Sequence, residues 1–283
     1  MKILVTGSQG FTGRYVKDEL IKNNHEVLDL EANLLDKKVL DIEIQSKEID
    51  AVMHLAGIAF VQHGNVNAIY ENNIIGTRNL LDTLASYAPK VKHVLLASSA
   101  NVYGNAKVEK ITEDTPLDPA NDYAISKVAM EYMAQLWMDR LPITITRPFN
   151  YTGVGQSEDF VIPKIVRHFK ERKDFIELGN IDVWREFNDV RAIANIYQKL
   201  IELKAVFGAV NLCSGVTYSL KEIIEMFSLI TNHKINIKVN KDLIRKNEVK
   251  KLAGDLDKLK SVIGDNKFFD IKETIHWMVN NHI

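Results

Sequence analysis

The amino-terminal stretch, Met1-Lys-Ile-Leu-Val-Thr-Gly-Ser-Gln-Gly-Phe-Thr-Gly13, constrains the fold more than any other part of the chain. Its apolar residues Ile3–Val5 predict a short buried strand, and Arg14–Lys22 predicts a helix with one apolar face. A strand, a glycine turn and a helix in this order can hold the diphosphate of a dinucleotide at the helix amino terminus. The stretch therefore predicts a dinucleotide site, although glycines at this spacing also occur in plain structural turns.

The composition argues against several classes of protein. The chain has 283 residues, 46% of them hydrophobic and 26% charged, with a net charge of -1. These values are ordinary for a globular protein, and they indicate neither a nucleic-acid nor a membrane partner. The lone Cys213, expected in the core, excludes an internal disulfide and favours a cytoplasmic location. The longest apolar run, Ala51–Val61, is too short to span a bilayer, and the first strand leaves no room for a signal peptide.

Strands alternate with helices over the first half of the chain. Strands are predicted at 25–30, 49–55, 93–97 and 143–146, and helices at 72–84 and 122–139. This alternation is typical of an α/β fold with a Rossmann-type doubly wound parallel sheet. After residue 150 the pattern changes, which predicts a smaller, interleaved α/β domain. We expect residues 1–150 to bind the dinucleotide and 151–283 mainly the substrate, with the helix at 189–204 packing back on the first domain.

Acidic residues after the second predicted strand bear on the choice of cofactor. Asp29 and Glu31 lie where a carboxylate hydrogen-bonds the adenosine ribose in folds of this type. A carboxylate there would repel a 2′-phosphate, which favours NAD over NADP, but both residues could equally be solvated acids. Glu31 is preferred because of the predicted strand length. Asp36 could reach the adenine edge or cap the next helix.

The third predicted strand ends in His54-Leu-Ala-Gly57. Small residues at this end of a parallel strand let a cofactor pass close to the backbone, so Leu55, Ala56 and Gly57 are candidate cofactor contacts. His54 is expected to be a packed histidine rather than a catalyst.

The segment Tyr123-Ala-Ile-Ser-Lys127, together with Ser99, is the most specific chemical feature. Tyr123 and Lys127 are four residues apart on a predicted helix, so their Cβ atoms lie about 6 Å apart on one face. A lysine ammonium beside a phenol stabilises the phenolate and lowers the phenol pKa from about 10. Ser99 follows a parallel strand, and its hydroxyl can bind the oxygen that gains or loses the proton. The set predicts acid–base catalysis; the alternative is a surface helix with a solvated lysine.

On these stretches the chain resembles the extended short-chain dehydrogenase/reductase family, specifically its enzymes that act on nucleotide-diphosphate sugars. The supporting runs are Thr6–Gly13, His54–Gly57, Asn73–Thr77, Ser98–Gly104, Tyr123–Lys127, Arg147–Asn150, Gly153–Ser157, Asp159–Pro163, Arg185–Val190 and Asn211–Gly215. The later runs are most similar to reductases of nucleotide-linked 4-keto-6-deoxyhexoses, of the GDP-4-keto-6-deoxymannose reductase type. By this resemblance Tyr123 is the general acid/base, Lys127 orients the nicotinamide ribose and Ser99 binds the reacting oxygen.

Further contacts complete the predicted site. The predicted cofactor contacts are Gly7, Gln9, Gly10, Phe11, Thr12, Gly13, Asp29, Glu31, Asp36, Leu55, Ala56, Gly57, Asn73 and Lys127. The resemblance implies that Ser99, Tyr123 and Asn150 face the substrate, and that Arg185 and Arg245 clamp its diphosphate through paired hydrogen bonds. Either arginine could instead form a surface ion pair, since Glu186 and Glu248 are near in sequence. No metal site is predicted.

The chain departs from the family pattern on the substrate side. Lys246 stands where family members usually have proline, and Tyr151 where they often have histidine. Dehydratases of the family carry acidic residues after the catalytic Ser or Thr, where this chain has Ala100 and Asn101. Dehydration, which needs an added proton shuttle, is therefore the least favoured reaction.

The resemblance favours NAD(P)H-dependent reduction of the C4 keto group of a nucleotide-diphospho-4-keto-6-deoxyhexose, with NAD slightly favoured over NADP. An NAD-dependent nucleotide-sugar 4-epimerase is the first alternative, and a non-catalytic nicotinamide-binding sensor is the second. The expected partner is a nucleotide-diphosphate sugar, and a homodimer through two helices per subunit is usual in the family.

Overall fold

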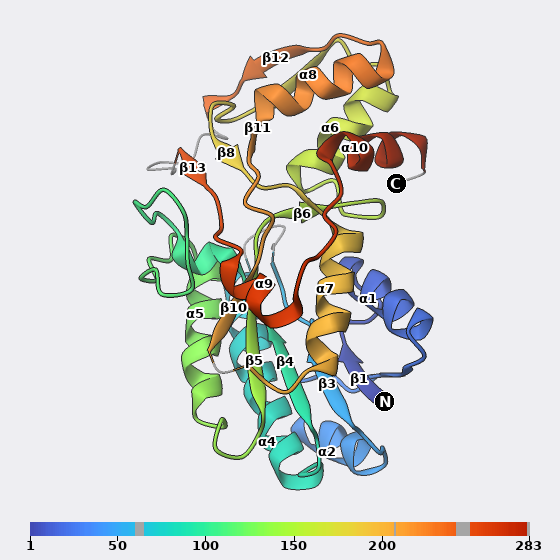
Figure 1. Cartoon of the computed structure of the whole chain (residues 1–283), viewed down its shortest axis with the longest axis vertical. Coiled ribbons are helices and arrows are strands. Elements are labelled where there is room, and N and C mark those ends of the chain that lie inside the picture. Colours follow the sequence, from blue (N-terminus) through green and yellow to red (C-terminus); the bar gives the residue numbers. More distant parts are fainter. Residues whose placement is uncertain (60–64, 207, 242–249, 282–283) are drawn as a thin grey trace.

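The computed structural model describes residues 1–59, 65–206, 208–241 and 250–281. Within them the centre is a 6-stranded parallel sheet in the order β10-β5-β4-β3-β1-β2 (Figure 1). Its strands are β1 Lys2–Thr6, β2 Glu26–Asp29, β3 Ala51–His54, β4 His93–Ala97, β5 Ile143–Pro148 and β10 Ala209–Leu212. The predicted doubly wound parallel sheet is confirmed, and its strand order reverses between β1 and β3.

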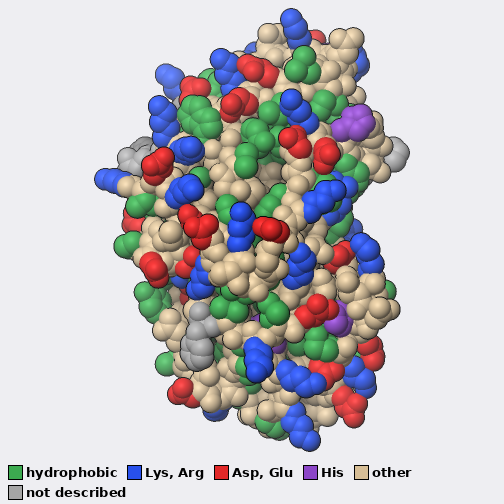
Figure 2. All heavy atoms as spheres, viewed as in Figure 1, with side chains coloured by type: hydrophobic (Ala, Val, Ile, Leu, Met, Phe, Trp, Pro, Cys, Tyr) green, Lys and Arg blue, Asp and Glu red, His purple; other side chains and the backbone are tan. Residues whose placement is uncertain are grey.

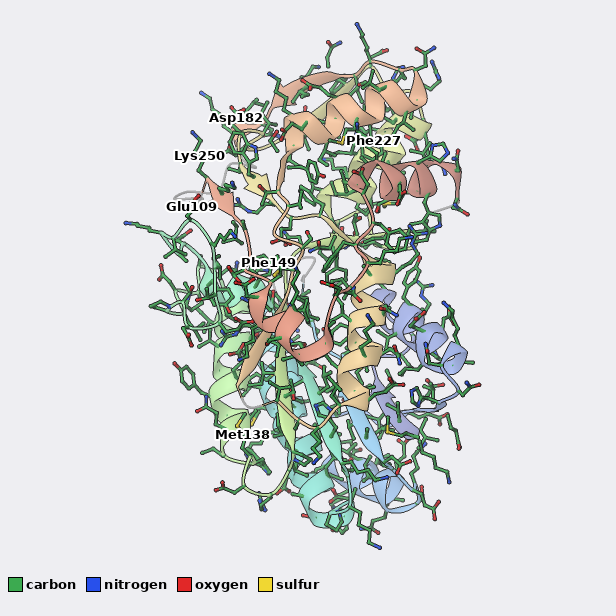
Figure 3. The ribbon with its side chains drawn as sticks, viewed as in Figure 1. Glu109, Met138, Phe149, Asp182, Phe227 and Lys250 are labelled. Atoms are coloured by element: carbon green, nitrogen blue, oxygen red, sulfur yellow. The ribbon has the colours of Figure 1, made fainter. Side chains whose placement is uncertain are left out.

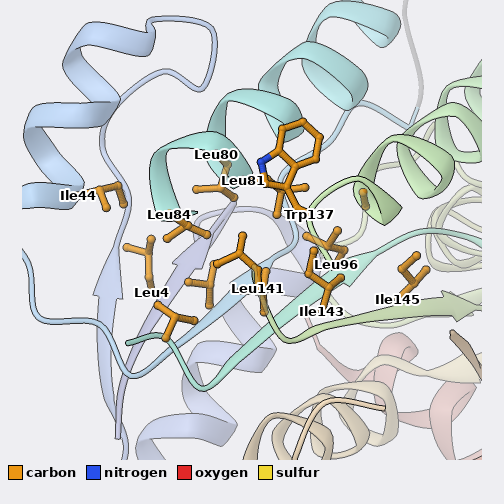
Figure 4. Close-up of a cluster of buried hydrophobic side chains, with 14 of the residues drawn as sticks. Leu4, Ile44, Leu80, Leu81, Leu84, Leu96, Trp137, Leu141, Ile143 and Ile145 are labelled. Atoms are coloured by element: carbon orange, nitrogen blue, oxygen red, sulfur yellow. The ribbon is translucent and has the colours of Figure 1, made fainter. Parts of the chain in front are cut away.

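Helices cover both faces of this sheet because successive strand residues point to opposite sides. Leu4, Val52 and Leu96 pack on one face, in the core shown in Figure 4, whereas Ile3 and Met53 pack on the other. The first face carries α2 Lys37–Gln45, α4 Thr77–Tyr87 and α5 Asp122–Gln135; the second carries α1 Phe11–Lys22, α7 Val190–Glu202 and α9 Asp257–Ile263. Before α4 the chain forms α3 Val66–Tyr70 and a π-helical turn, η1 Glu71–Gly76, and after β4 a 3-10 turn, η2 Ala100–Tyr103.

A smaller part lies at the carboxyl end of the sheet and has its own core. Its helices are α6 Val161–Lys170, α8 Leu220–Thr231 and α10 Ile271–Asn280; its short strands are β6 Tyr151–Thr152, β7 Phe175–Leu178, β8 Trp184–Arg185, β9 Asn188–Asp189, β11 Tyr218–Ser219, β12 Asn236–Val239 and β13 Lys251–Leu252. Phe227 of α8 stacks on Phe169 in this core, with ring centroids 5.3 Å apart. Phe149, which follows β5, lies between the two parts (Figure 3).

Several predicted boundaries differ from the structure. The predicted helix over 72–84 is preceded by α3 and starts within the π-helical turn, and the second strand ends at Asp29. The sequence pattern did not predict β10, because a strand buried along its whole length shows no polar alternation. Cys213, directly after β10, is fully buried, as expected. The division of binding roles at residue 150 stays a prediction, although β10 and α7 contribute to the first part's sheet and covering layer.

The surface shows no concentration of one charge in the view of Figure 2, where acidic and basic side chains are interspersed. Among the described helices, none is both long enough and apolar enough to cross a membrane.

The glycine turn yields a stability prediction. A Cβ at Gly13 would lie 2.1 Å from the Gly7 carbonyl oxygen, whereas a Cβ at Gly10 would lie 3.2 Å from the same atom. We expect Gly13→Ala to lower the free energy of unfolding by about 3 kcal/mol or more, since the clash is with backbone. The matched Gly10→Ala variant should lose about 1 kcal/mol or less. Urea unfolding measures both, and equal stabilities would contradict this packing.

Candidate active site

The glycine turn lies at the point where the strand order reverses. Gly7 has a φ of +70°, and a Cβ there would lie 2.8 Å from the Ala56 nitrogen. The turn after β1 therefore packs directly on the chain leaving β3, and only glycine allows that approach. The structure thus brings together the predicted cofactor contacts of the turn and those at Leu55–Gly57.

The start of α1 is open to a ligand. Its N-cap is Gly10, and no side chain caps the helix. Amino-terminal N–H groups of a helix lack intrahelical acceptors, so this turn can bind a phosphate. Phe11 and Thr12 form the first turn and are half-buried, whereas Gln9 is exposed beside them.

Three predicted carboxylates have different surroundings. Asp29 ends β2, and its Oδ2 lies 2.6 Å from Lys17 Nζ, an interaction that holds its pKa below the usual range. Its Oδ1 is buried without a hydrogen-bond partner among the described residues. Glu31 lies beyond the strand and is exposed, and Asp36 caps α2 by accepting from the Val39 N–H. Asp29 is therefore the carboxylate at the end of β2. The sequence analysis preferred Glu31 because it predicted a strand over 25–30, but the strand ends at Asp29.

A buried chain of hydrogen bonds runs from the glycine turn across β3. The Ala56 N–H donates to Thr6 Oγ1, which lies 2.6 Å from His54 Nδ1. On the far side His54 Nε2 lies 2.8 Å from Thr77 Oγ1, and the Thr77 hydroxyl donates to the Asn73 carbonyl. Because that hydroxyl proton is already used, His54 donates from Nε2 and accepts at Nδ1. His54 is thus a packed, neutral histidine.

Asn73 continues this chain to α5. Its side chain accepts from the Ile58 N–H at 2.9 Å and donates to Ser126 Oγ at 2.9 Å, and Ser126 donates to the Tyr123 carbonyl. Asn73 lies in the π-helical turn, a distortion that often marks a functional position. The predicted cofactor contacts at Ala56 and Asn73 are therefore linked to the helix that carries Tyr123.

Lys127 and Asn73 both approach Gly57. A Cβ at Gly57 would lie 3.2 Å from Lys127 Nζ and 3.0 Å from Asn73 Oδ1. Lys127 is buried, its Nζ donates to the Ala97 carbonyl at 2.8 Å, and burial lowers its pKa to about 8. The alternative of a solvated surface lysine is therefore wrong.

Tyr123 is half-buried on α5, close enough to Ser99 for the two side chains to interact. Loss of solvent raises the Tyr123 pKa to about 12, and the interaction with Ser99 opposes this only in part. The sequence predicted the opposite, a phenol pKa lowered by Lys127. The prediction was wrong in sign because it considered the shared helix face but not the loss of solvent around the phenol.

Glu131, one helical turn beyond Lys127, is a buried carboxylate beside the predicted site that the sequence analysis missed. Its carboxylate accepts from Arg147 on β5, at 2.6 Å from Nη2, and from Ser98 Oγ. All three side chains are buried. The spacing of four from Lys127 was the available signal, because it places Glu131 on the same helix face.

The substrate-side candidates are partly defined. Asn150 is exposed directly before β6, and its carbonyl accepts from the Asn188 N–H at 2.9 Å. Arg185 on β8 is half-buried, and its Nη1 donates to the Trp184 carbonyl. Glu186 is buried and accepts from the Gly254 N–H, so it is not a surface ion-pair partner. Arg245, Lys246 and Glu248 lie outside the described residues.

Two cavities lie apart from these residues. One of about 680 Å³ adjoins Arg191 and Trp277, and one of about 290 Å³ adjoins Phe187 and Tyr218. None of the predicted site residues lines either cavity.

Comparisons with known proteins agree with this geometry. The sequence profile of the NAD dependent epimerase/dehydratase family matches residues 3–213. GDP-6-deoxy-D-talose 4-dehydrogenase of Aggregatibacter actinomycetemcomitans is 32% identical over 100% of this chain and 98% of its own. Among solved structures, a candidate epimerase from Burkholderia cenocepacia J2315 has 41% identity and a TM-score of 0.93, covering 99% of this chain and 97% of its own. RMD from Pseudomonas aeruginosa, complexed with NADPH, has 28% identity and a TM-score of 0.89, covering 98% and 97%.

The buried histidine yields a pH prediction. Burial lowers the His54 pKa to about 3, below its unfolded value of about 6.5. As the pH falls, the imidazole is therefore protonated in the unfolded chain before it is protonated in the folded one. The free energy of unfolding should therefore fall as the pH drops below about 6.5, by up to about 1.4 kcal/mol per pH unit from this group. His54→Gln keeps one donor and one acceptor but cannot titrate, so its slope should be shallower.

Urea unfolding at several pH values between about 4.5 and 7 compares the two slopes. The pKa of His93 is also lowered by burial, but His93 is present in both proteins and cancels from the difference. Parallel slopes would show that His54 titrates freely in the folded protein.

Proposed function

The chain belongs to the NAD dependent epimerase/dehydratase family, and we propose that it reduces the C4 keto group of a nucleotide-diphospho-4-keto-6-deoxyhexose with NAD(P)H. One arrangement carries the proposal: Lys127 Nζ lies against Gly57 beside the glycine turn, and Tyr123, one helical turn before Lys127 on α5, lies close enough to Ser99 for the two side chains to interact. A proton donor and the glycine turn thus lie together at the carboxyl end of the sheet. The relative named as a 4-dehydrogenase of a GDP-6-deoxy sugar supports a GDP-linked substrate first.

In the proposed reaction the carbonyl carbon gains hydride and the carbonyl oxygen gains a proton. The bound reduced nicotinamide supplies the hydride. Tyr123 donates its phenolic proton to the oxygen, and Ser99 hydrogen-bonds the same oxygen as negative charge develops on it. Asn150 would orient the sugar, while Arg185 and Arg245 would hold its diphosphate.

The phenol of Tyr123 carries the proton that the proposed reduction needs. With a pKa of about 12 it is protonated at neutral pH, and the same group would take the proton back in the reverse reaction. Lys127, with a pKa of about 8, is mostly charged at neutral pH and would stabilise the phenolate left after transfer.

A 4-epimerase is the second candidate, supported by the family description and by the similarity to a candidate epimerase structure. An epimerase oxidises and re-reduces its substrate on one bound cofactor, so it consumes no added NADH. A sensor without catalysis is less well supported, because sensing needs no proton donor at Tyr123. A homodimer and a cytoplasmic location remain predictions from the sequence.

The proposal is tested with GDP-, dTDP-, UDP- and CDP-linked 4-keto-6-deoxysugars, each with NADH and NADPH. We expect the absorbance of the reduced nicotinamide to fall with at least one sugar, fastest with a GDP sugar. Product stereochemistry by NMR distinguishes net reduction from interconversion. Epimerised product without loss of absorbance would favour the epimerase, and binding without any product would favour the sensor.

The proton donor is tested by Tyr123→Phe. This variant should bind cofactor normally and lose turnover by about 10²-fold or more, because only the donated proton is removed. Tyr132→Phe, on the exposed face of the same helix, is the matched control and should keep full turnover. Undiminished turnover in Tyr123→Phe would refute the proposed acid.

The cofactor preference is tested at the two rival carboxylates. The free, buried Oδ1 of Asp29 can accept from a ribose hydroxyl, and its charge would repel a 2′-phosphate. Asp29→Asn should reduce any preference for NADH over NADPH by about tenfold, since it also releases the Lys17 ammonium toward a phosphate. Glu31→Gln should leave the ratio unchanged. The reverse pattern would restore Glu31 as the ribose carboxylate.

A further inference from the structure

Tyr151 stands directly after Asn150 and contacts the first turn of α1. Its hydroxyl lies 2.7 Å from Thr12 Oγ1, and its ring stacks on Phe11 with centroids 6.1 Å apart and planes 11° apart. Both contacts span nearly 140 positions in sequence. They connect the predicted phosphate-binding turn to the predicted substrate-facing segment.

Within the described residues, no side chain caps the first turn of α1. Its N-cap, Gly10, has no side chain, although the Gly10 N–H donates to the Gly7 carbonyl. Tyr15 donates to the Val154 carbonyl at 2.7 Å and packs edge-on against Phe11, and Arg14 donates to the Gly155 carbonyl. Tyr151 therefore shares the contact with Phe11 but alone, in the described part of the chain, supplies the side-chain hydrogen bond to Thr12.

Tyr151 is itself rigidly placed. Its strand β6 pairs with β9, where Tyr151 is opposite Asn188, and the Asn188 N–H donates to the preceding carbonyl of Asn150. Tyr151 also lies close enough to Tyr123 to contribute to the raised pKa of that phenol. Tyr151 is therefore held by its own strand pairing while it contacts the first turn of α1.

We infer that Tyr151 is a positioning residue for the dinucleotide: through its hydrogen bond to Thr12 and its stacking on Phe11, it holds the first turn of α1 in place for the cofactor phosphate. This inference rests on the proposed function, since it assumes that a dinucleotide binds at this turn. The sequence marked Tyr151 only as a departure from a frequent histidine. Its partner Thr12 became visible only in three dimensions.

The test is to measure the binding of NADH and of NADPH by isothermal titration calorimetry, without any sugar present. We expect Tyr151→Phe to raise the Kd about fivefold for whichever cofactor the wild-type protein binds more tightly. This is the usual effect of one lost hydrogen bond. In turnover assays the cofactor KM should rise by a similar factor, with kcat changed less than about twofold. The melting temperature should fall no further than in Tyr15→Phe, which loses a hydrogen bond of the same kind, and this comparison separates positioning from general stability.

Tyr15→Phe is the matched control, because it removes one phenolic hydrogen bond between the same helix and the same loop, one turn away. It should change the Kd by less than about twofold. Thr12→Val should weaken binding, and the double variant Thr12→Val/Tyr151→Phe should bind no more weakly than Thr12→Val alone, because the two hydroxyls act as one pair.

The outcomes separate the two proposals. If the wild-type protein binds neither NADH nor NADPH, the proposed function fails. If it binds one of them and Tyr151→Phe binds equally well, the inference about Tyr151 is overturned while the function stands. Equal losses in Tyr151→Phe and Tyr15→Phe, or additive losses in the double variant, would also overturn it.

Discussion

A buried ion pair between Glu131 and Arg147 holds the three elements of the proposed chemistry together. Glu131 extends from α5, Arg147 from the end of β5, and Ser98, which also donates to the carboxylate, from the end of β4. The helix α5 carries the proposed proton donor, β4 leads to the serine proposed to bind the reacting oxygen, and β5 leads to the asparagine proposed to face the substrate. A buried pair of this kind adds little net stability, but losing one partner strands a charge away from water. Its contribution here is geometric, because the three elements cannot shift independently while the pair is intact.

Loss of solvent also determines the charge states of Tyr123 and Lys127. It raises the pKa of Tyr123 to about 12 and lowers that of Lys127 to about 8, so it opposes charge on both groups. The phenol consequently holds its proton at neutral pH, and the lysine can lose or gain one near neutrality. In the proposed reaction the phenol would donate this proton, and the charge left on it would be offset by the neighbouring Lys127 ammonium.

Local rules predicted the parts of this protein that local structure decides. The glycine turn, the Tyr123–Lys127 spacing and the packed His54 follow from steric and periodic constraints within a few residues. What failed depended on distant groups. The sign of the Tyr123 pKa shift depends on solvent exclusion by other elements, and the Thr12–Tyr151 contact joins the glycine turn to β6 in the smaller part. The strand β10 was missed for a different reason, because a strand buried along its whole length shows no polar alternation.

The substrate side is fixed by a second buried carboxylate that uses a different kind of partner. Glu186 accepts from the backbone N–H groups of Ser214 and Gly254, each at 2.7 Å, and from the Asn188 side chain. Burial raises its pKa, and the backbone donors counter that effect. Because the Asn188 N–H also donates to the Asn150 carbonyl, this carboxylate is linked through Asn188 to the residue proposed to face the substrate. The proposed proton donor and this residue are therefore each held by buried polar contacts, the first through the Glu131–Arg147 pair on its helix and the second through Glu186 and Asn188.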